Sequence, residues 1–312
     1  MSRWTTTGLY VLLAALWGTS FVATRAALAA FPPILLAALR FDVAGVFVLG
    51  YALATTRRWR PRSREDWLSI ALGGVLFVAA HHAFLFTGQQ YVTAAVAAIV
   101  ISLDPVLATG FSRVLLPDAR LSRLASVGLL LGLLGVVVVA NPTPSSLLSG
   151  DVLGIGLVFL AAAAFALAAV TTSRYRTTLP VQSMQAWMML VGAVVLHATA
   201  AVLPGEGFSA VHWTTAALLS FGYLAVVTGA FGYLLYFELL DRLGPVEINL
   251  VGYVIPIFAA LGGWAVLGET VTVQTAAGFV VIVCGFVLVK HRAILDELRS
   301  AGVVRDESVT ES

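Results

Sequence analysis

Ten apolar runs follow one another between about Thr7 and Lys290, and each is long enough to cross a lipid bilayer. Hydrophobic residues make up 60% of the chain and charged residues only 11%, a balance that no water-soluble fold could bury. Lipid offers backbone groups no partners, and the runs lack the two-residue alternation of barrel strands. We therefore predict an all-α transmembrane bundle of ten helices. The predicted spans are 7–29, 33–55, 67–87, 93–115, 123–140, 152–173, 183–204, 214–239, 245–268 and 272–290.

Basic residues fall in alternate connections between these spans. The even-numbered connections carry them, whereas the odd-numbered connections carry none. Cytoplasmic loops hold an excess of Lys and Arg, so we expect the even-numbered connections and both termini to be cytoplasmic. Ordinary solvation would explain why arginines lie in loops, but not why they skip every second loop. Reporter tags that place Arg60 and Arg174 on opposite sides of the bilayer would contradict this orientation. The basic residues concerned are Arg57, Arg58, Arg60, Arg62, Arg64, Arg120, Arg123, Arg174, Arg176 and Arg242.

The chain looks doubled, with a Pro- and Ser-rich loop at 141–150 between two halves of similar length. Pro105 precedes Asp118 by thirteen residues, and Pro256 precedes Glu269 by thirteen. Two glycines then follow each proline at nearly the same spacing, namely Gly128 with Gly135 and Gly278 with Gly285. The alternative is a chance alignment of helices rich in Leu, Ala and Gly.

Each half has five helices, an odd number, so the second half enters the membrane from the opposite side. We predict two inverted repeats, 7–140 and 151–290, followed by a cytoplasmic tail at 291–312. Inverted repeats give a central site two equivalent ways to open, which is the geometry of a transporter.

Six strings stand in a recognisable order along the helices: LAALWGTSFVATRAAL, LRFDVAG, LDPVLAT, GLLLGLLGVVVV, VIPIFAALGGWAVLGE and GFVVIVCGFVLV. In order and spacing they resemble the ten-helix members of the drug/metabolite transporter superfamily, which are built from two EamA domains. The resemblance covers nearly the whole chain. It implies a permease of the cytoplasmic membrane, often an exporter of small metabolites or amino acids, with a cavity between the two bundles and no bound cofactor.

Ionisable side chains at membrane depth cost about 2.5 to 3.5 kcal/mol each, so they are expected to face a cavity or one another. The candidates are Arg40, Asp42, His81, His82 and Asp104. Arg40 and Asp42 are two residues apart and point to nearly opposite sides of a helix, so we place only Arg40 in the cavity. Its functional role would be to receive an anionic group such as a carboxylate, with Asp104 as resting partner or proton acceptor. The alternative is a permanent Arg40–Asp104 pair that fixes helix packing.

Adjacent histidines point about 100° apart, so one of His81 and His82 could face the cavity and couple protons while the other packs. Both could equally be packing residues. No other Cys or His lies nearby in sequence to complete a metal shell. Aromatic rings could line the cavity or simply pack in the core. Two prolines are candidate hinges or ordinary kinks. The rings are Trp17, Phe21, Trp187 and Tyr223, and the prolines are Pro105 and Pro256.

Several classes of protein are disfavoured by what the sequence lacks. Lys290 is the only lysine and no GxxxxGK string occurs, so we expect no P-loop for ATP. Without a GxSxG or HExxH motif, we predict that the chain is not an enzyme. An intramembrane enzyme built on His81, His82 and Asp104 is one alternative, and a membrane scaffold or sensor is another.

The expected partners are a small-molecule substrate and the lipid bilayer, with protons as a candidate coupling ion. The net charge of +2 gives no reason to expect nucleic acid, because the arginines would lie against lipid headgroups. We predict a secondary transporter of the cell membrane that works by alternating access, without metal or cofactor. We expect a monomer or weak homo-oligomer, and export rather than uptake.

Overall fold

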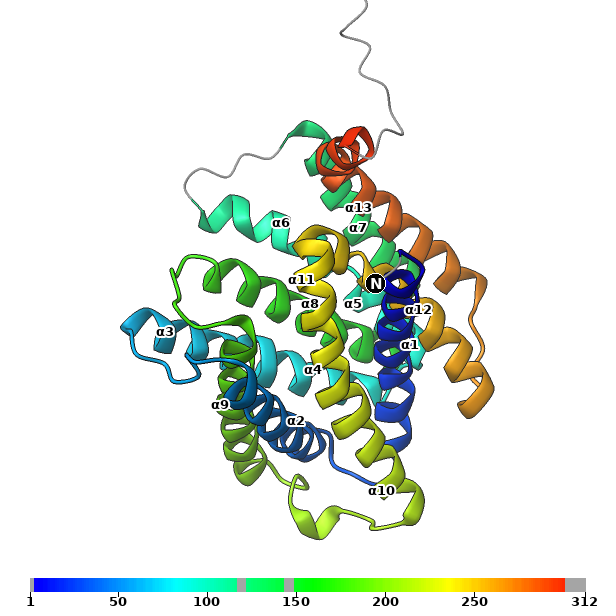
Figure 1. Ribbon diagram of the computed structural model, residues 1–312. Coiled ribbons are helices and arrows are strands. Elements are labelled where there is room, and N and C mark those ends of the chain that lie inside the picture. The colour runs from blue at the N-terminus through cyan, green and yellow to red at the C-terminus, as the bar shows by residue number, and fades with distance from the viewer. Residues whose placement is uncertain (1–2, 117–121, 143–148, 301–312) are drawn as a thin grey trace, which may run out of the picture.

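The computed structural model describes residues 3–116, 122–142 and 149–300, which form a bundle of helices (Figure 1). The first half contains α1 (Arg3–Ala27), α2 (Pro33–Thr55), α3 (Arg64–Leu72), the π-helix η1 (Gly73–Ala80), α4 (His81–Gln89), α5 (Ala94–Ile101), α6 (Asp104–Leu115) and α7 (Arg123–Ala140). The second half contains α8 (Gly150–Thr172), α9 (Val181–Val202), the short 3₁₀-helix η2 (Phe208–Ala210), α10 (Thr215–Gly222), the π-helix η3 (Tyr223–Phe231), α11 (Gly232–Asn249), α12 (Val251–Gly262), the π-helix η4 (Gly263–Leu267) and α13 (Val273–Ser300).

Nine helical stretches of this part of the chain are long and apolar enough to cross a membrane, and the apolar stretch Val251–Leu267 is a shorter tenth. The described ranges contain no strand, so the prediction of an all-α transmembrane bundle is confirmed. The third span runs through α3, η1 and α4, and the eighth runs through α10, η3 and α11. In the fourth span, Ser102 and Leu103 separate α5 from α6.

The eighth span is longer than the sequence predicted. It continues past residue 239 to Gly244, whose φ of 79° and ψ of 172° interrupt the helix. The charged residues near 240 had suggested a loop between two spans. In the structure they remain helical, because Glu238 and Arg242 are four residues apart and form an ion pair on the helix surface. Gly244 then supplies a positive φ that other residues adopt only with strain. Leu250 joins α11 to α12.

Polar caps fix where several spans begin. The hydroxyls of Thr93, Ser122, Ser149 and Thr214 each accept a hydrogen bond from the backbone N–H three residues further along. Ser63 and Asp66 form a capping box at the start of α3. The predicted connection residues Pro117, Asp118 and Arg120, the loop centre 143–148 and the end of the tail from 301 lie outside the described residues.

The two halves of the chain interlock. Four of the closest helix pairs each join one helix from the first half to one from the second, namely α7 with α13, α2 with α9, α1 with α12 and α4 with α8. Glycines let α7 and α13 approach closely, because a Cβ atom on Gly285 would lie 2.6 Å from the carbonyl oxygen of Gly128 and 2.6 Å from the nitrogen of Gly132. The division into repeats at 7–140 and 151–290 stays a prediction.

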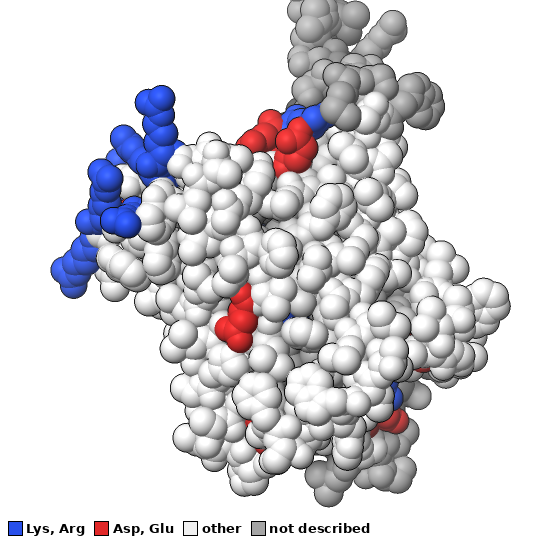
Figure 2. All heavy atoms as spheres, turned by 60° about the horizontal axis from the view of Figure 1, so that its bottom comes forward, with Lys and Arg blue, Asp and Glu red and all other residues white. Residues whose placement is uncertain are grey.

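Hydrogen bonds group the connections at two ends of the bundle. We call the end formed by 56–63 and 173–180 the basic end, because these connections carry six of the arginines considered above. We call the end formed by 28–32, 90–93, 203–214 and 268–272 the acidic end, after Glu206 and Glu269. On the face that Figure 2 shows, most Lys and Arg side chains gather at one edge beside a broad and largely uncharged surface.

Candidate functional site

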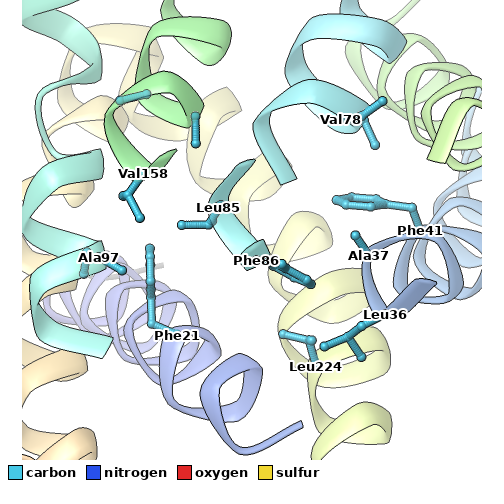
Figure 3. Close-up of a cluster of buried hydrophobic side chains, with 14 of the residues drawn as sticks. Phe21, Leu36, Ala37, Phe41, Val78, Leu85, Phe86, Ala97, Val158 and Leu224 are labelled. Carbon is cyan, nitrogen blue, oxygen red and sulfur yellow. The ribbon is translucent and has the colours of Figure 1, made fainter. Parts of the chain in front are cut away.

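Arg40 lies in the interior of the bundle. Its side chain projects from α2 and is 7% exposed. The guanidinium carbon lies 5.3 Å from the centre of the Phe41 ring and 5.8 Å from that of the Phe86 ring on α4. Figure 3 shows both rings pointing into the space between α2 and α4. Arg40 makes no hydrogen bond or ion pair with any described residue, and its Nε atom is fully buried without a partner. A cation is therefore held here between aromatic walls and without a counter-charge.

His81 and His82 lie beside this arginine, at the start of α4. Their ring centres are 4.6 Å apart, and the His82 ring packs edge-on against Phe41 at 4.4 Å. Each Nδ1 faces a carbonyl oxygen, that of Ala161 at 2.9 Å for His81 and that of Val78 at 3.0 Å for His82. A carbonyl can only accept, so each Nδ1 carries a proton, and in the neutral form of each ring Nε2 is the acceptor. Both rings are anchored in the same way, and the expected division into one packing and one cavity histidine stays a prediction.

The eighth span borders the cluster as well, in addition to α2 and α4. Gly229 of η3 lies against α2 beside the arginine, because a Cβ atom there would lie 3.2 Å from the Cβ atom of Ala44 and 4.0 Å, an ordinary contact distance, from the Nε atom of Arg40. Tyr233 follows on α11, and the Trp17 ring of α1 lies 5.6 Å from it. Trp17 was a candidate from its sequence position, whereas Gly229, Tyr233 and Phe86 were not. The cluster thus comprises Arg40, Phe41, His81, His82, Phe86, Tyr233, Gly229 and Trp17.

Two π-helices adjoin this cluster. η1 ends immediately before His81, and η3 contains Gly229 and ends just before α11. A π-helix widens the turn and is often found at functional sites. The two segments occupy the third span of one half and the third span of the other. The sequence indicates these π-helices only through their glycines. These are Gly73 and Gly74 in η1, Gly222 just before η3 and Gly229 within it.

Asp104 lies at a second polar position, at the first residue of α6. Its Oδ1 atom and the hydroxyl of Tyr253 on α12 are both buried without a hydrogen-bond partner. The Tyr253 ring lies 4.2 Å from that of Phe286. No ion pair joins Asp104 to Arg40 among the described residues, so the structure does not bring these two candidates together. Pro105 follows Asp104 directly after the interruption between α5 and α6, whereas Pro256 lies inside α12.

The remaining aromatic candidates have structural contacts. The Trp187 indole N–H donates to the carbonyl of Trp59 at 2.8 Å, and the ring packs edge-on against Trp67, so Trp187 anchors the basic end. The hydroxyls of Tyr223 and Thr19 lie 2.8 Å apart and join η3 to α1. Phe21 is buried in the main core, where it points from α1 toward Ala97 (Figure 3). These contacts favour the packing interpretation for Trp187 and Phe21.

The acidic end is tied together by polar contacts between the halves. Glu269 accepts a hydrogen bond from the backbone N–H of Ala94 at 2.9 Å and lies 3.8 Å from the Nε atom of Arg25. Arg25 in turn donates to the carbonyls of Gln89 and Gln90 at 2.7 Å each. Glu206 accepts from two N–H groups at the start of α2. A hollow of about 380 Å³ opens at this end, but no residue of the Arg40 cluster lines it.

Comparison with known proteins identifies the family of the chain. Residues 5–141 and 152–290 match the EamA-like transporter family. The chain is 28% identical to the inner membrane transporter YedA of Escherichia coli strain K12, over 88% of this chain and 87% of that protein. It is 26% identical to the transporter YvbV of Bacillus subtilis, over 95% of this chain and 94% of that protein. A solved crystal structure with 23% identity aligns over 95% of this chain and 100% of its own, with a TM-score of 0.61, and shows the same fold. The chain belongs to the EamA-like transporter family and is a multi-pass protein of the cell membrane.

Proposed function

We propose that this protein is a secondary transporter that moves a small carboxylate-bearing compound, such as an amino acid or an amphipathic metabolite, by alternating access. The observation that carries the proposal is the buried Arg40 guanidinium, which has no anionic partner in the described part of the chain. The relatives are named as transporters, which supports transport rather than catalysis. Export rather than uptake is what the resemblance to the family implies.

An unpaired cation in a membrane protein is costly, because neither lipid nor packed side chains replace its hydration shell. A protein keeps such a group where an anionic partner arrives and leaves. A carboxylate suits the guanidinium, since its two oxygens match the planar fork of N–H donors. The rings of Phe41 and Phe86 flank the charge and offer flat apolar surfaces to the remainder of an amphipathic molecule. Together these features favour a compound with one carboxylate and an apolar body.

Alternating access requires that one end of the bundle be closed while the other is open. The contacts of Arg25, Glu269 and Ala94 join the two halves at the acidic end, as a closed end would require. The positive-inside bias supports a cytoplasmic basic end, with both termini on that side. Inverted repeats would then let the basic end close by equivalent motions when the acidic end opens. Pro105 and Pro256 are our candidate hinges for this motion.

The purified protein in liposomes tests this function. Vesicles are loaded with labelled amino acids, monocarboxylates and amines of similar size, and efflux is compared with that from protein-free vesicles. We expect efflux of at least one carboxylate-bearing compound, recovered chemically unchanged, and competition by other carboxylates. Transport restricted to amines would overturn the assignment of an anion site, and recovery of a converted product would indicate an enzyme.

Asp104 is the candidate proton carrier. A carboxyl group at this depth must hold a proton or face a cation, because an unpaired charge is costly there. If Asp104 exchanges a proton during each transport cycle, flux should depend on pH in the wild type and lose that dependence in Asp104→Asn. The measurement is efflux from liposomes with equal pH on both sides, varied from about 5 to 8, where carboxyl groups at functional sites titrate. A pH profile in Asp104→Asn that matches the wild type would exclude this residue as the carrier.

A further inference from the structure

Asp42 and His197 form a polar pair on the outer surface of the bundle. The Nε2 atom of His197 on α9 lies 2.7 Å from the Oδ2 atom of Asp42 on α2. The side chains of His197 and Asp42 are 36% and 44% exposed, respectively, so the pair does not face the interior as Arg40 does. Asp42 is about 14 Å along α2 from its first residue, and His197 is about 8 Å from the last residue of α9. Both therefore lie well within membrane-spanning helices.

The surroundings of the pair are apolar and exposed. Val46 and Phe47 on α2 are 62% and 55% exposed, and Val194 on α9 is 69% exposed. Side chains of this kind at this depth face lipid. A half-exposed carboxylate and imidazole have no favourable contact with hydrocarbon, because lipid tails neither donate nor accept hydrogen bonds. This face of α2 and α9 therefore needs a polar neighbour.

The pair leaves one acceptor and one donor-capable atom free for that neighbour. Asp42 uses Oδ2 and His197 uses Nε2, so Oδ1 of the carboxylate and Nδ1 of the imidazole have no bond to a described residue. A surface that carries both a donor and an acceptor is complementary to itself. In the ion-paired form, in which both imidazole nitrogens are protonated, Nδ1–H is a second donor. A two-fold axis near the pair would then set the Nδ1–H group of one copy opposite the carboxylate of the other, and the reverse, as an isologous interface requires.

We propose that a second copy of this chain docks on the α2–α9 face, and that Asp42 and His197 of the two copies hydrogen-bond across the two-fold axis. Small polar groups that pair across helices are a recurring means of association in membranes. The dimer leaves the Arg40 cluster of each copy inside its own bundle, so each copy would work as a separate transport unit. The proposal does not rest on the transport function.

Disulfide cross-linking in native membranes tests the dimer. The single native thiol is first removed by Cys284→Ala, and one new cysteine is then placed at the exposed positions Val46, Val194 or Ala198, with Val280→Cys on α13 as the exposed control. Copper phenanthroline supplies the oxidant. We expect a cross-linked dimer from at least one α2–α9 position, with a yield several times that of Val280→Cys. Yields no higher than the control at all three positions would overturn the proposal.

A double substitution tests the polar pair itself. It is made in the single-cysteine variant that gives the highest yield of cross-linked dimer. Asp42→Leu with His197→Leu substitutes side chains that lipid accepts, so insertion and folding are expected to persist. Size-exclusion chromatography of the detergent-solubilised protein verifies this. We expect the cross-linked fraction to fall to the level of the Val280→Cys control. An undiminished fraction would show that the pair does not hold the copies together.

Discussion

Replacing Arg40 by glutamine is expected to lower the flux of carboxylate-bearing substrates at least tenfold. The guanidinium is the only positively charged group in the described cluster, and glutamine offers the carboxylate a neutral donor in place of a charged fork. Losing one partner of a buried charge pair costs about 2 to 5 kcal/mol, which corresponds to roughly thirtyfold or more in affinity. The measurement is initial efflux from liposomes at substrate concentrations below saturation.

Arg60→Gln is the matched control, because Arg60 lies on the exposed surface of the basic end over the Trp59 ring. It removes the same charge by the same substitution and should leave flux unchanged. Arg40→Lys should fall between the wild type and Arg40→Gln, since the ammonium keeps the charge but loses the bidentate geometry. Equal flux in Arg40→Gln and the wild type would remove Arg40 from the substrate site.

Thermal stability separates this role from a structural one. Arg40 forms no hydrogen bond or ion pair with a described residue, so Arg40→Gln removes an uncompensated charge and breaks no bond. The melting temperature should therefore stay the same or rise. A permanent pair that fixes helix packing predicts the opposite, because removing one member of a buried pair is strongly destabilising. A lower melting temperature together with lost flux would favour the packing interpretation.

The spans could be predicted because the membrane restricts the backbone so strongly. The second and fifth spans, 33–55 and 123–140, begin and end where the sequence placed them. Pro32 and Pro33 begin one of these helices, and the Ser122 cap begins the other. The eighth span was harder, because the pair between Glu238 and Arg242 keeps charged residues in a helix, and only Gly244 ends it.

Some members of the candidate cluster could be predicted from the sequence. Arg40 stood out because a charged side chain within an apolar run needs an explanation. His81 and His82 stood out for the same reason, as ionisable residues at membrane depth. Gly229, Tyr233 and Phe86 did not stand out, because apolar and aromatic residues are abundant in every span. Their roles depend on how η3 and α4 pack against α2, and on π-helical turns that shift the register of the helix. Trp187 was proposed for the cavity, yet its contacts with Trp59 and Trp67 depend on a loop conformation that hydropathy does not reveal.

Replacing Gly285 by valine is expected to prevent the close packing of α7 on α13. Even the first side-chain carbon would lie 2.6 Å from backbone atoms of Gly128 and Gly132, and helix backbones cannot move aside as a flexible side chain can. Overpacking in a rigid interface costs about 1 to 3 kcal/mol and occasionally more, and here the two helices must also separate along their length. We expect a melting temperature lower by roughly 10 °C, or loss of the folded fraction. Fluorescence-detected size-exclusion chromatography after heating provides the measurement.

The control for this substitution is Gly156→Val on α8, where a Cβ atom would meet nothing within 4 Å. Helical propensity favours residues with a side chain over glycine, so this variant should be as stable as the wild type or slightly more so. Gly285→Ala gives an intermediate test, because alanine would improve helical propensity by up to about 1 kcal/mol if no atom stood in its way. A Gly285→Ala variant more stable than the wild type would show that α7 and α13 are not packed through their glycines. The expected loss of stability would instead indicate that these two helices, one from each half, are joined too closely to slide independently during transport.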